Sequence, residues 1–192
     1  EDLTHVTSEA NQRLFLDEEL SSPSHGTAVL GIIAAEDNGF GMTGIASECD
    51  PYFFPTFSLN FGGRLTSAIT SAVLELGPGD VMNFSIGFPG ARGNDCSTAS
   101  EYVTSSAAVY TLVRNASNLG ITSVMSAGNS CCNLDSTSEA GDDSGGIIVS
   151  ACDPGAPFCR RSFSNHSATC PATIPHVSAW GDYVATCAGS GA

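Results

Sequence analysis

The sequence contains no lysine, so all six of its positive charges are arginine. Twenty acidic residues outweigh them and give a formal net charge of −14. Nucleic acids and anionic membrane surfaces attract proteins through positive potential, so we expect neither of them as a partner. The acidic residues are scattered along the chain rather than grouped in runs, and we interpret them as a source of solubility.

A long apolar run is also lacking. No stretch has the roughly 20 apolar residues that a membrane-spanning helix needs, and no signal peptide stands at the start. The chain begins without methionine and ends on "CAGSGA", which has the character of neither a closing helix nor a tail. These features predict one domain that is a piece of a longer protein.

Cysteine spacing of the zinc-binding type is absent, although cysteine itself is abundant. The eight cysteines include no C-x-x-C pair. We therefore predict disulfide bonds, formed in an oxidising compartment, and a secreted location. The pairing stays open, although adjacent cysteines are expected to bond to two different partners. The eight are Cys49, Cys96, Cys131, Cys132, Cys152, Cys159, Cys170 and Cys187.

Helix and strand patterns alternate along the chain. "RLTSAITSAVLEL" places apolar residues at the spacing of an amphipathic helix, and "GPG" ends it. Strand, helix and strand in this order predict βαβ units, and hence an α/β fold with a parallel sheet and helices on both faces. The expected helices cover 25–35, with Ser24 as N-cap, 65–76 and 101–118, and the expected strands cover 51–58, 80–87, 121–129 and 145–151.

Three motifs follow one another on these elements: "SHGTAVLGIIAA", "VMNFSIG" and "VMSAGNS". Their order and character resemble the subtilisin-like serine proteases, the subtilases of peptidase family S8. In that family a histidine motif H-G-T-x-V-x-G comes first, a substrate-binding strand ends in S-[LI]-G, and an oxyanion asparagine closes A-G-N. The segment "GGIIVSACDPGAPFCRRSFSNHS" extends the resemblance, which covers nearly all of the chain. It implies the subtilisin-like fold, a three-layer α/β domain with a mostly parallel β-sheet flanked by helices.

The resemblance implies a role for each matching residue. His25 would be the catalytic base that takes the proton of a serine hydroxyl and gives it to the leaving amine. The alternative is a polar residue that caps a helix. Asn129 would donate its side-chain amide to the developing oxyanion, and the alternative is a loop asparagine with an unusual backbone. An extended polypeptide substrate would pair with the backbone of Ser85, Ile86 and Gly87, and Ser126, Ala127 and Gly128 would line the pocket.

Two members of the subtilase triad are missing from the sequence. The nucleophile motif G-T-S-x-[AS]-x-P does not occur, and by the family likeness its serine would lie after Ala192. The orienting aspartate would lie before Glu1, because "EDL" resembles the dipeptide that follows it in the family, and Asp17 is not expected to replace it. We therefore predict that residues 1–192 form a partial catalytic domain, inactive alone, of a secreted serine endopeptidase. The alternatives are a subtilase-like pseudoenzyme that binds peptides without cutting them, and an unrelated parallel α/β domain.

The segment "EDNGFGM" at 36–42 resembles the calcium loop of the family. By this likeness, side-chain oxygens of Asp2 and Asn38 and carbonyls of Glu36, Phe40 and Met42 would surround the ion. Oxygen-only ligation suits calcium, and the alternative is a glycine-rich surface turn. The chemistry itself requires no cofactor, and we expect a monomer.

Overall fold

The computed structural model describes Leu3 and residues 23–54, 56–58, 62–63, 65–87, 106–134, 143–166 and 176–187. Its contacts divide the chain into two compact units. One comprises Glu1–Ser71 with Val184–Ala192, and the other comprises Ala72–Tyr183. Helix α2, Leu65–Glu75, crosses the boundary between them in the sequence and confirms the helix expected at 65–76. Among the described residues, no helix combines the length and apolar content that a bilayer crossing requires.

The first unit contains helix α1, Pro23–Ala34, which confirms the helix expected at 25–35. The helix begins earlier than expected, so Ser24 lies within its first turn and is not the N-cap. Proline suits the first helical position, because its fixed φ is helical and its missing amide has no partner there in any case. At the other end, the loop 44–46 donates backbone hydrogen bonds of 2.8–3.0 Å to the carbonyls of Ile32, Ile33 and Ala35. These bonds satisfy carbonyls that a helix end leaves without a partner in the helix.

The strand expected at 51–58 is largely wrong. Only β1, Phe57–Ser58, is a strand, and it pairs antiparallel with β2, Gly62–Gly63. The apolar and aromatic residues of this stretch suggested a longer strand, but prolines at positions 51 and 55 have no amide hydrogen to donate to a ladder.

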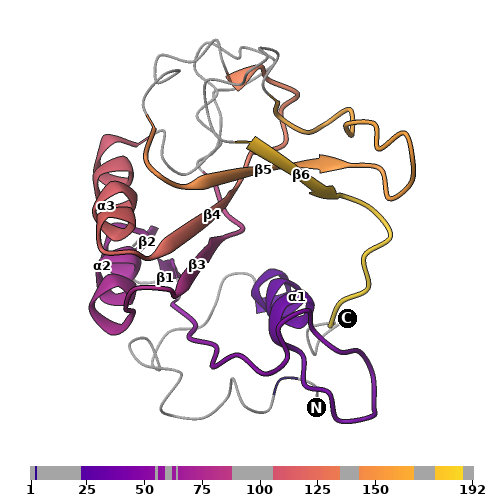
Figure 1. The fold of residues 1–192 in the computed structure, drawn as a ribbon, viewed down its shortest axis with the longest axis horizontal. Helices are drawn as coiled ribbons and strands as arrows, with labels where there is room; N and C mark the ends of the chain where they lie inside the picture. Colours follow the sequence, from indigo (N-terminus) through magenta and orange to yellow (C-terminus); the bar gives the residue numbers. More distant parts are fainter. Residues whose placement is uncertain are drawn as a thin grey trace. The chain divides into compact units, whose positions relative to one another are not determined.

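Among its described residues, the second unit contains a parallel sheet of four strands, β3 (Val81–Phe84), β4 (Thr122–Ser126), β5 (Ile147–Cys152) and β6 (His176–Trp180). Their order in the sheet is that of the chain, and β4, β5 and β6 run side by side in Figure 1. The first three confirm the strands expected at 80–87, 121–129 and 145–151, with shorter bounds. Strand β6 was not predicted from the sequence.

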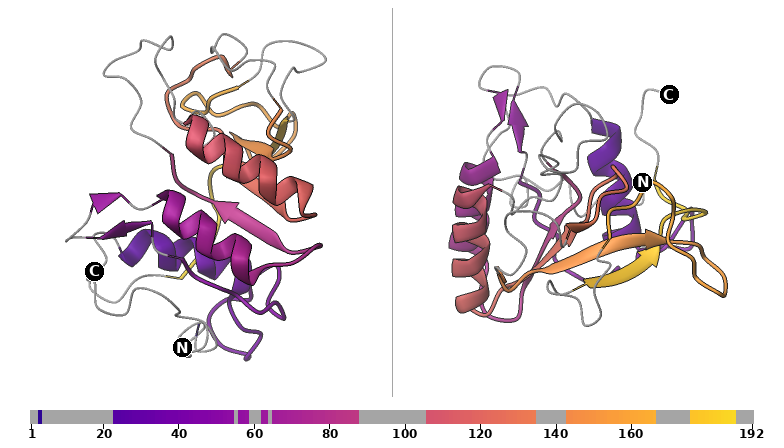
Figure 2. Two further views of the ribbon diagram at one scale, coloured as in Figure 1. Left: turned by 90° about the vertical axis from the view of Figure 1, so that its left-hand side faces the viewer. Right: turned by 90° about the horizontal axis from the view of Figure 1, so that it is seen from above.

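Helix α3, Ala107–Asn118, packs against β4 on one face of the sheet (Figures 1 and 2). It confirms the helix expected at 101–118 from residue 107 on, and residues 101–105 lie outside the described part. Side chains alternate along β3, β4 and β5 between buried and more exposed positions, as the pleat of a strand requires. The buried set meets the apolar stripe of α3, and together they form the core: Met82, Phe84, Val109, Val113, Ala116, Ile121, Met125 and Ile148.

The register of the sheet brings the carboxyl ends of its strands to one edge. Phe84 lies opposite Met125, Ser126 lies opposite Val149, and Cys152 lies opposite Trp180. In open parallel sheets, ligands bind beyond this edge. The segments that follow β3 and β4 carry the "SIG" and "AGN" motifs, so the fold places both motifs there.

Candidate active site

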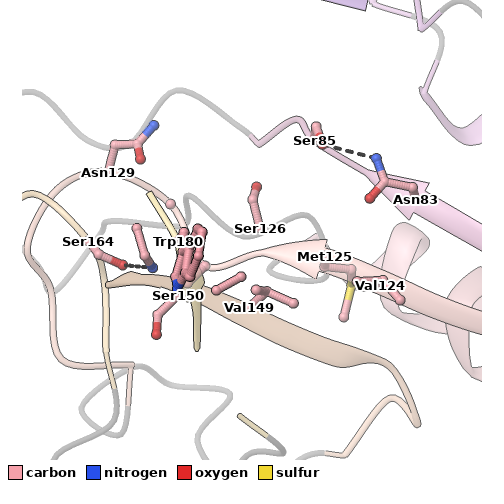
Figure 3. A pocket seen from close by; sticks show the side chains of 14 residues that line it. Asn83, Ser85, Val124, Met125, Ser126, Asn129, Val149, Ser150, Ser164 and Trp180 are labelled. Carbon is pink, nitrogen blue, oxygen red and sulfur yellow. Dashed lines mark hydrogen bonds between the residues drawn. The ribbon is translucent and has the colours of Figure 1, made fainter. Parts of the chain in front are cut away.

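A pocket of about 270 Å³ opens at the carboxyl edge of the sheet (Figure 3). It draws on the ends of all four strands and on the segment that precedes β6. None of its lining residues carries a charge: four are serines, two are asparagines and the others are apolar. The lining comprises Asn83, Ser85, 124–129, 149–151, Ser164, Ala179 and Trp180.

The residues that were expected to bind substrate gather at this edge. Ser85 lines the pocket directly, and so do all of 126–128 and Asn129. Ile86 takes part through its backbone, because its carbonyl accepts a hydrogen bond of 3.3 Å from Ser126 Oγ. Gly87 follows it and is exposed. The structure thus brings the two predicted segments together, and their role in binding substrate stays a prediction.

Two side-chain hydrogen bonds fix the ends of β3 and β4. Asn83 Nδ2 donates to Ser85 Oγ over 2.9 Å, which holds the serine that begins the "SIG" segment (Figure 3). The bond from Ser126 to Ile86 then ties the end of β4 to this segment. Both bonds use short polar side chains, which leave space in front of the strand ends.

Asn129 lies in the loop that follows β4, with its side chain exposed at the rim of the pocket (Figure 3). The loop turns sharply, because Gly128 and Cys131 both have left-handed backbones, with φ of 97° and 57°. Such turns leave amide and carbonyl groups without regular partners. In this loop those groups form hydrogen bonds with residues 163–166, and most of these bonds involve the fully buried Asn165.

His25 lies in the first turn of α1, in the first unit, and its side chain is exposed. The pocket with Asn129 belongs to the second unit. The expectation that both side chains face one cleft stays a prediction.

The loop expected to bind calcium is a glycine turn within the first unit. Gly39 and Gly41 have left-handed backbones, and Asn38 Oδ1 accepts a hydrogen bond of 3.0 Å from the amide of Phe40. Glu36 and Met42 are half-buried and Phe40 is exposed, while the expected ligand at position 2 lies outside the described residues. Within the described part of the chain, no three His, Cys, Asp or Glu side chains cluster as a metal site would require.

An arginine holds the segment between β5 and β6 in place. Arg161 forms ion pairs of 2.7 Å with Asp153 and 2.6 Å with Asp182, and so joins the turn after β5 to the end of β6. Its hydrogen bond to Asp153 is the main reason that the pKa of Arg161 is raised, with a further contribution from the charge of Asp182. The guanidinium therefore stays charged. Its two ion pairs stabilise the segments that carry Ser164 and Trp180 beside the pocket.

Five of the cysteines lie among the described residues with free thiols: Cys49, Cys131, Cys152, Cys159 and Cys187. The structure therefore gives no support to a disulfide at these positions. The expectation that the adjacent Cys131 and Cys132 bond to two different partners is wrong at Cys131. Burial raises the pKa of the Cys49 thiol, with the charge of Asp50 adding to the effect.

The part of the pocket that comes from β5, β6 and the segment between them was not predicted from the sequence. Val149, Ser164 and Trp180 all line the pocket. Val149 and Ser164 belong to the segment "GGIIVSACDPGAPFCRRSFSNHS", to which no role in the site was assigned, and Trp180 belongs to no motif that was singled out. The rule that ligands bind at the carboxyl edge of a parallel sheet could have pointed to the residues that end the 145–151 strand. It gave no signal for Trp180, because β6 was not expected.

Solved structures similar to this chain include a subtilisin-like serine proteinase and a psychrophilic protease. A cold adapted subtilisin-like serine proteinase matches with a TM-score of 0.59 and 22% identity, over 85% of this chain and 50% of that one. Sphericase matches with a TM-score of 0.59 and 17% identity, over 88% and 56% of the two chains. S41, a psychrophilic protease, matches with a TM-score of 0.64 and 19% identity, over 94% and 62%. The chain thus spans about half to three-fifths of the length of these proteins, and the likeness confirms the three-layer α/β fold.

A comparison with curated protein sequences finds no significant match. The model of the subtilase family, in contrast, matches residues 2–191, nearly the whole of the chain. Together with the "HGT", "SIG" and "AGN" motifs and the parallel sheet that carries the last two, this match shows that the chain belongs to the subtilase family.

Proposed function

We propose that this chain is the central part of a secreted serine endopeptidase and that it carries the base, the oxyanion donor and the substrate-binding segments of the active site. One observation carries the proposal. In a chain of the subtilase family, the pocket at the carboxyl edge of the sheet unites Asn129 with the ends of β3 and β4. An asparagine side chain at the rim of an uncharged pocket is a suitable donor for an oxyanion.

In the proposed reaction, a serine Oγ attacks the carbonyl carbon of the scissile peptide bond, and His25 takes the hydroxyl proton. The carbonyl oxygen becomes an oxyanion, to which the amide of Asn129 donates a hydrogen bond. His25 then gives the proton to the leaving amine, and the acyl-enzyme is hydrolysed by water in the same manner. The substrate lies extended along Ser85–Gly87 as an added strand.

The serine and the aspartate of the triad are proposed to lie outside this chain, in a longer parent protein. The coverage of 50–62% of the similar proteases supports this arrangement. The 192-residue chain alone is accordingly expected to be inactive, whereas the parent is expected to act as a monomer on polypeptides.

The test is hydrolysis of a chromogenic peptide amide by the full-length protein, with and without a serine-directed organophosphorus inhibitor. Inhibitor-sensitive cleavage that His25→Ala abolishes supports the proposal. A folded full-length protein that binds peptides without cutting them would instead identify a pseudoenzyme. Inhibitor-sensitive cleavage by the 192-residue chain alone would contradict the proposed division of the triad.

Calcium is proposed as a structural ion of the first unit, without a part in the chemistry. The donor set is limited to oxygen, with Asp2 and Asn38 side chains and the carbonyls of Glu36, Phe40 and Met42, and this composition fits calcium. Thermal unfolding in millimolar CaCl₂ and in EDTA tests the site, with Asn38→Ala as the variant. An unfolding temperature that does not depend on calcium would contradict it.

A secreted location and disulfide bonds are proposed from composition, with eight cysteines and no lysine on a polar, acidic chain. Mass spectrometry of the natural protein after alkylation, with and without prior reduction, counts the oxidised cysteines. Alkylation of all eight without reduction would contradict the disulfides.

A further inference from the structure

The segment that precedes β6 contains one side chain whose hydrogen bonds surround the position of Asn129. Asn165 is 0% exposed, and its carboxamide both donates and accepts hydrogen bonds. Its Nδ2 donates to the carbonyl of Ala127 over 2.9 Å. Its Oδ1 accepts from the amides of Ser130 over 3.1 Å and Cys132 over 2.8 Å. These partners stand on both sides of Asn129 in the chain.

The backbone of the same segment completes the support. The amide of Asn165 donates to the carbonyl of Gly128 over 3.0 Å, and the amide of Cys131 donates to the carbonyl of Phe163 over 2.8 Å. The amide of His166 donates to the carbonyl of Cys132 over 2.9 Å. The carbonyls of Ala127, Gly128 and Cys132 and the amides of Ser130, Cys131 and Cys132 thus all bond to the segment 163–166. A loop with two left-handed residues needs such partners from elsewhere in the chain.

Only a primary carboxamide satisfies this set of partners. The carbonyl of Ala127 needs a donor, and the amides of Ser130 and Cys132 need an acceptor. An aspartate could not donate to Ala127, and an aliphatic side chain could form none of the three hydrogen bonds. A buried group left without its partner costs more than an ordinary hydrogen bond contributes. The geometry of the loop is thus coupled to the identity of this one side chain.

We propose that Asn165 is a positioning residue that holds the amide of Asn129 where the oxyanion forms. The inference rests on the proposed function, because it assigns a task to Asn129. An oxyanion donor must lie about 2.7–3.1 Å from the oxyanion. Asn129 is exposed, so the loop backbone determines where its side chain starts. A displacement of about 1 Å costs on the order of 100-fold in rate.

The test is a double-mutant cycle in the full-length protein, with Asn165→Leu and Asn129→Ala as the two changes. Leucine keeps the approximate volume and removes all three side-chain hydrogen bonds. With Asn129 present, Asn165→Leu is expected to lower kcat about 100-fold, with KM changed by less than about threefold. In the Asn129→Ala background, the same change is expected to lower kcat by less than about threefold, since the donor that it positions is already gone.

Asn165→Asp is the milder variant and guards against a failure of Asn165→Leu to fold. It keeps the acceptor for Ser130 and Cys132 and loses the donor to Ala127, so it is expected to lose about tenfold in kcat, again only when Asn129 is present. Ser144→Ala is the matched control. Ser144 is also buried, and its Oγ accepts a bond of 3.3 Å from the amide of Gly146, before β5 and outside the pocket. It is expected to leave kcat unchanged.

Hydrogen exchange supplies a readout that does not depend on activity. Asn165→Leu is expected to speed exchange of the Ser130 and Cys132 amides at least tenfold, and to leave the amide of Met125 in β4 unchanged. Equal losses of kcat in both backgrounds, or unchanged exchange, would overturn the positioning role in a protein whose wild type is active. A wild type without peptidase activity would overturn the proposed function, and the positioning role with it.

Discussion

Asn129 supplies the clearest test at the scale of a single residue. It lines the pocket from the loop after β4, and its proposed task is to stabilise charge that exists only in the transition state. Asn129→Ala in the full-length protein is therefore expected to lower kcat about 10²–10³-fold and to leave KM nearly unchanged. Steady-state kinetics with a peptide amide measures both constants.

Asn118→Ala is the control for this prediction. Asn118 is an exposed asparagine at the end of α3, on the amino side of β4 and away from the pocket. It is expected to leave both constants unchanged. A loss in Asn129→Ala that appears in KM alone would assign Asn129 to ground-state binding of the substrate and not to the oxyanion.

Single residues also show where sequence reasoning ends. His25 and Asn129 stand in short motifs whose residue types and order are visible in the sequence. Asn165 lies in the "SFSNHS" end of the segment that resembles the family, but no role was predicted for it, because its side-chain partners lie 33 to 38 residues away. Nothing local distinguishes it from an ordinary loop asparagine, so its role required the folded structure.

At the scale of elements, segments with a clear apolar pattern were predicted well and segments without one were not. The stripe of α2 and the apolar cores of β3, β4 and β5 are local properties, and all four elements were found. Strand β6 has the sequence "HVSAW", and "TCPATIP" with two prolines precedes it, so it had no strong signal. Its place in the sheet depends on pairing with β5, which the sequence does not reveal.

Helix α1 gives a prediction in which packing opposes propensity. Alanine in place of a helical glycine normally stabilises by about 1 kcal/mol. A Cβ at Gly31, however, would lie 2.7 Å from the backbone nitrogen of Cys187 and 2.8 Å from its Sγ. Such overpacking costs about 1–3 kcal/mol, so Gly31→Ala is expected to destabilise the protein. The free energy of unfolding in urea measures the change.

Gly155→Ala serves as the comparison for Gly31→Ala. A Cβ at Gly155 meets nothing within 4 Å, and this glycine is exposed. The unfolding free energy of Gly155→Ala is expected to stay within about 0.5 kcal/mol of that of the wild type. If Gly31→Ala proved as stable as Gly155→Ala, this result would contradict the close contact between Gly31 and Cys187.

Helix α3 ends in a way that requires glycine. Gly120 has a φ of 81°, its amide donates to the carbonyl of Ser117, and the amide of Ile121 donates to the carbonyl of Ala116, both over 3.0 Å. This is the Schellman pattern, with its left-handed residue directly after the C-cap. Gly120→Ala is expected to lower the free energy of unfolding by about 1–2 kcal/mol, because a Cβ is strained in this conformation.

Thermal unfolding measures the effect at Gly120, and Ser117→Ala is a suitable comparison because it keeps the carbonyl that accepts the Gly120 bond. The expected loss should appear as a lower unfolding temperature in Gly120→Ala and as a much smaller change in Ser117→Ala. Equal stability of Gly120→Ala and the wild type would show that the helix does not end in a left-handed residue.

At the scale of the whole molecule, the net charge of −14 is the dominant electrostatic feature. Like charges repel within a compact protein, and salt screens this repulsion over about 10 Å at 0.1 M. Raising NaCl from 10 to 200 mM in EDTA is therefore expected to stabilise the fold by about 1 kcal/mol, or roughly 2–4 °C in unfolding temperature. Differential scanning calorimetry measures the shift.

Potassium chloride at the same ionic strength is expected to give the same shift, because the effect is one of screening. An unfolding temperature that fell with salt would mean that attractive ion pairs, such as those of Arg161, outweigh the general repulsion.

The strands of the second unit occupy the sheet in the same order in which they occur in the chain. Each of these four described strands therefore joins the edge left by its predecessor, and none of them has to enter between two earlier ones. A nascent chain can add β3, β4, β5 and β6 one at a time as it leaves the ribosome, from the amino-terminal side onward. Synthesis and strand pairing proceed in the same direction, so the sheet that carries the pocket can assemble during translation.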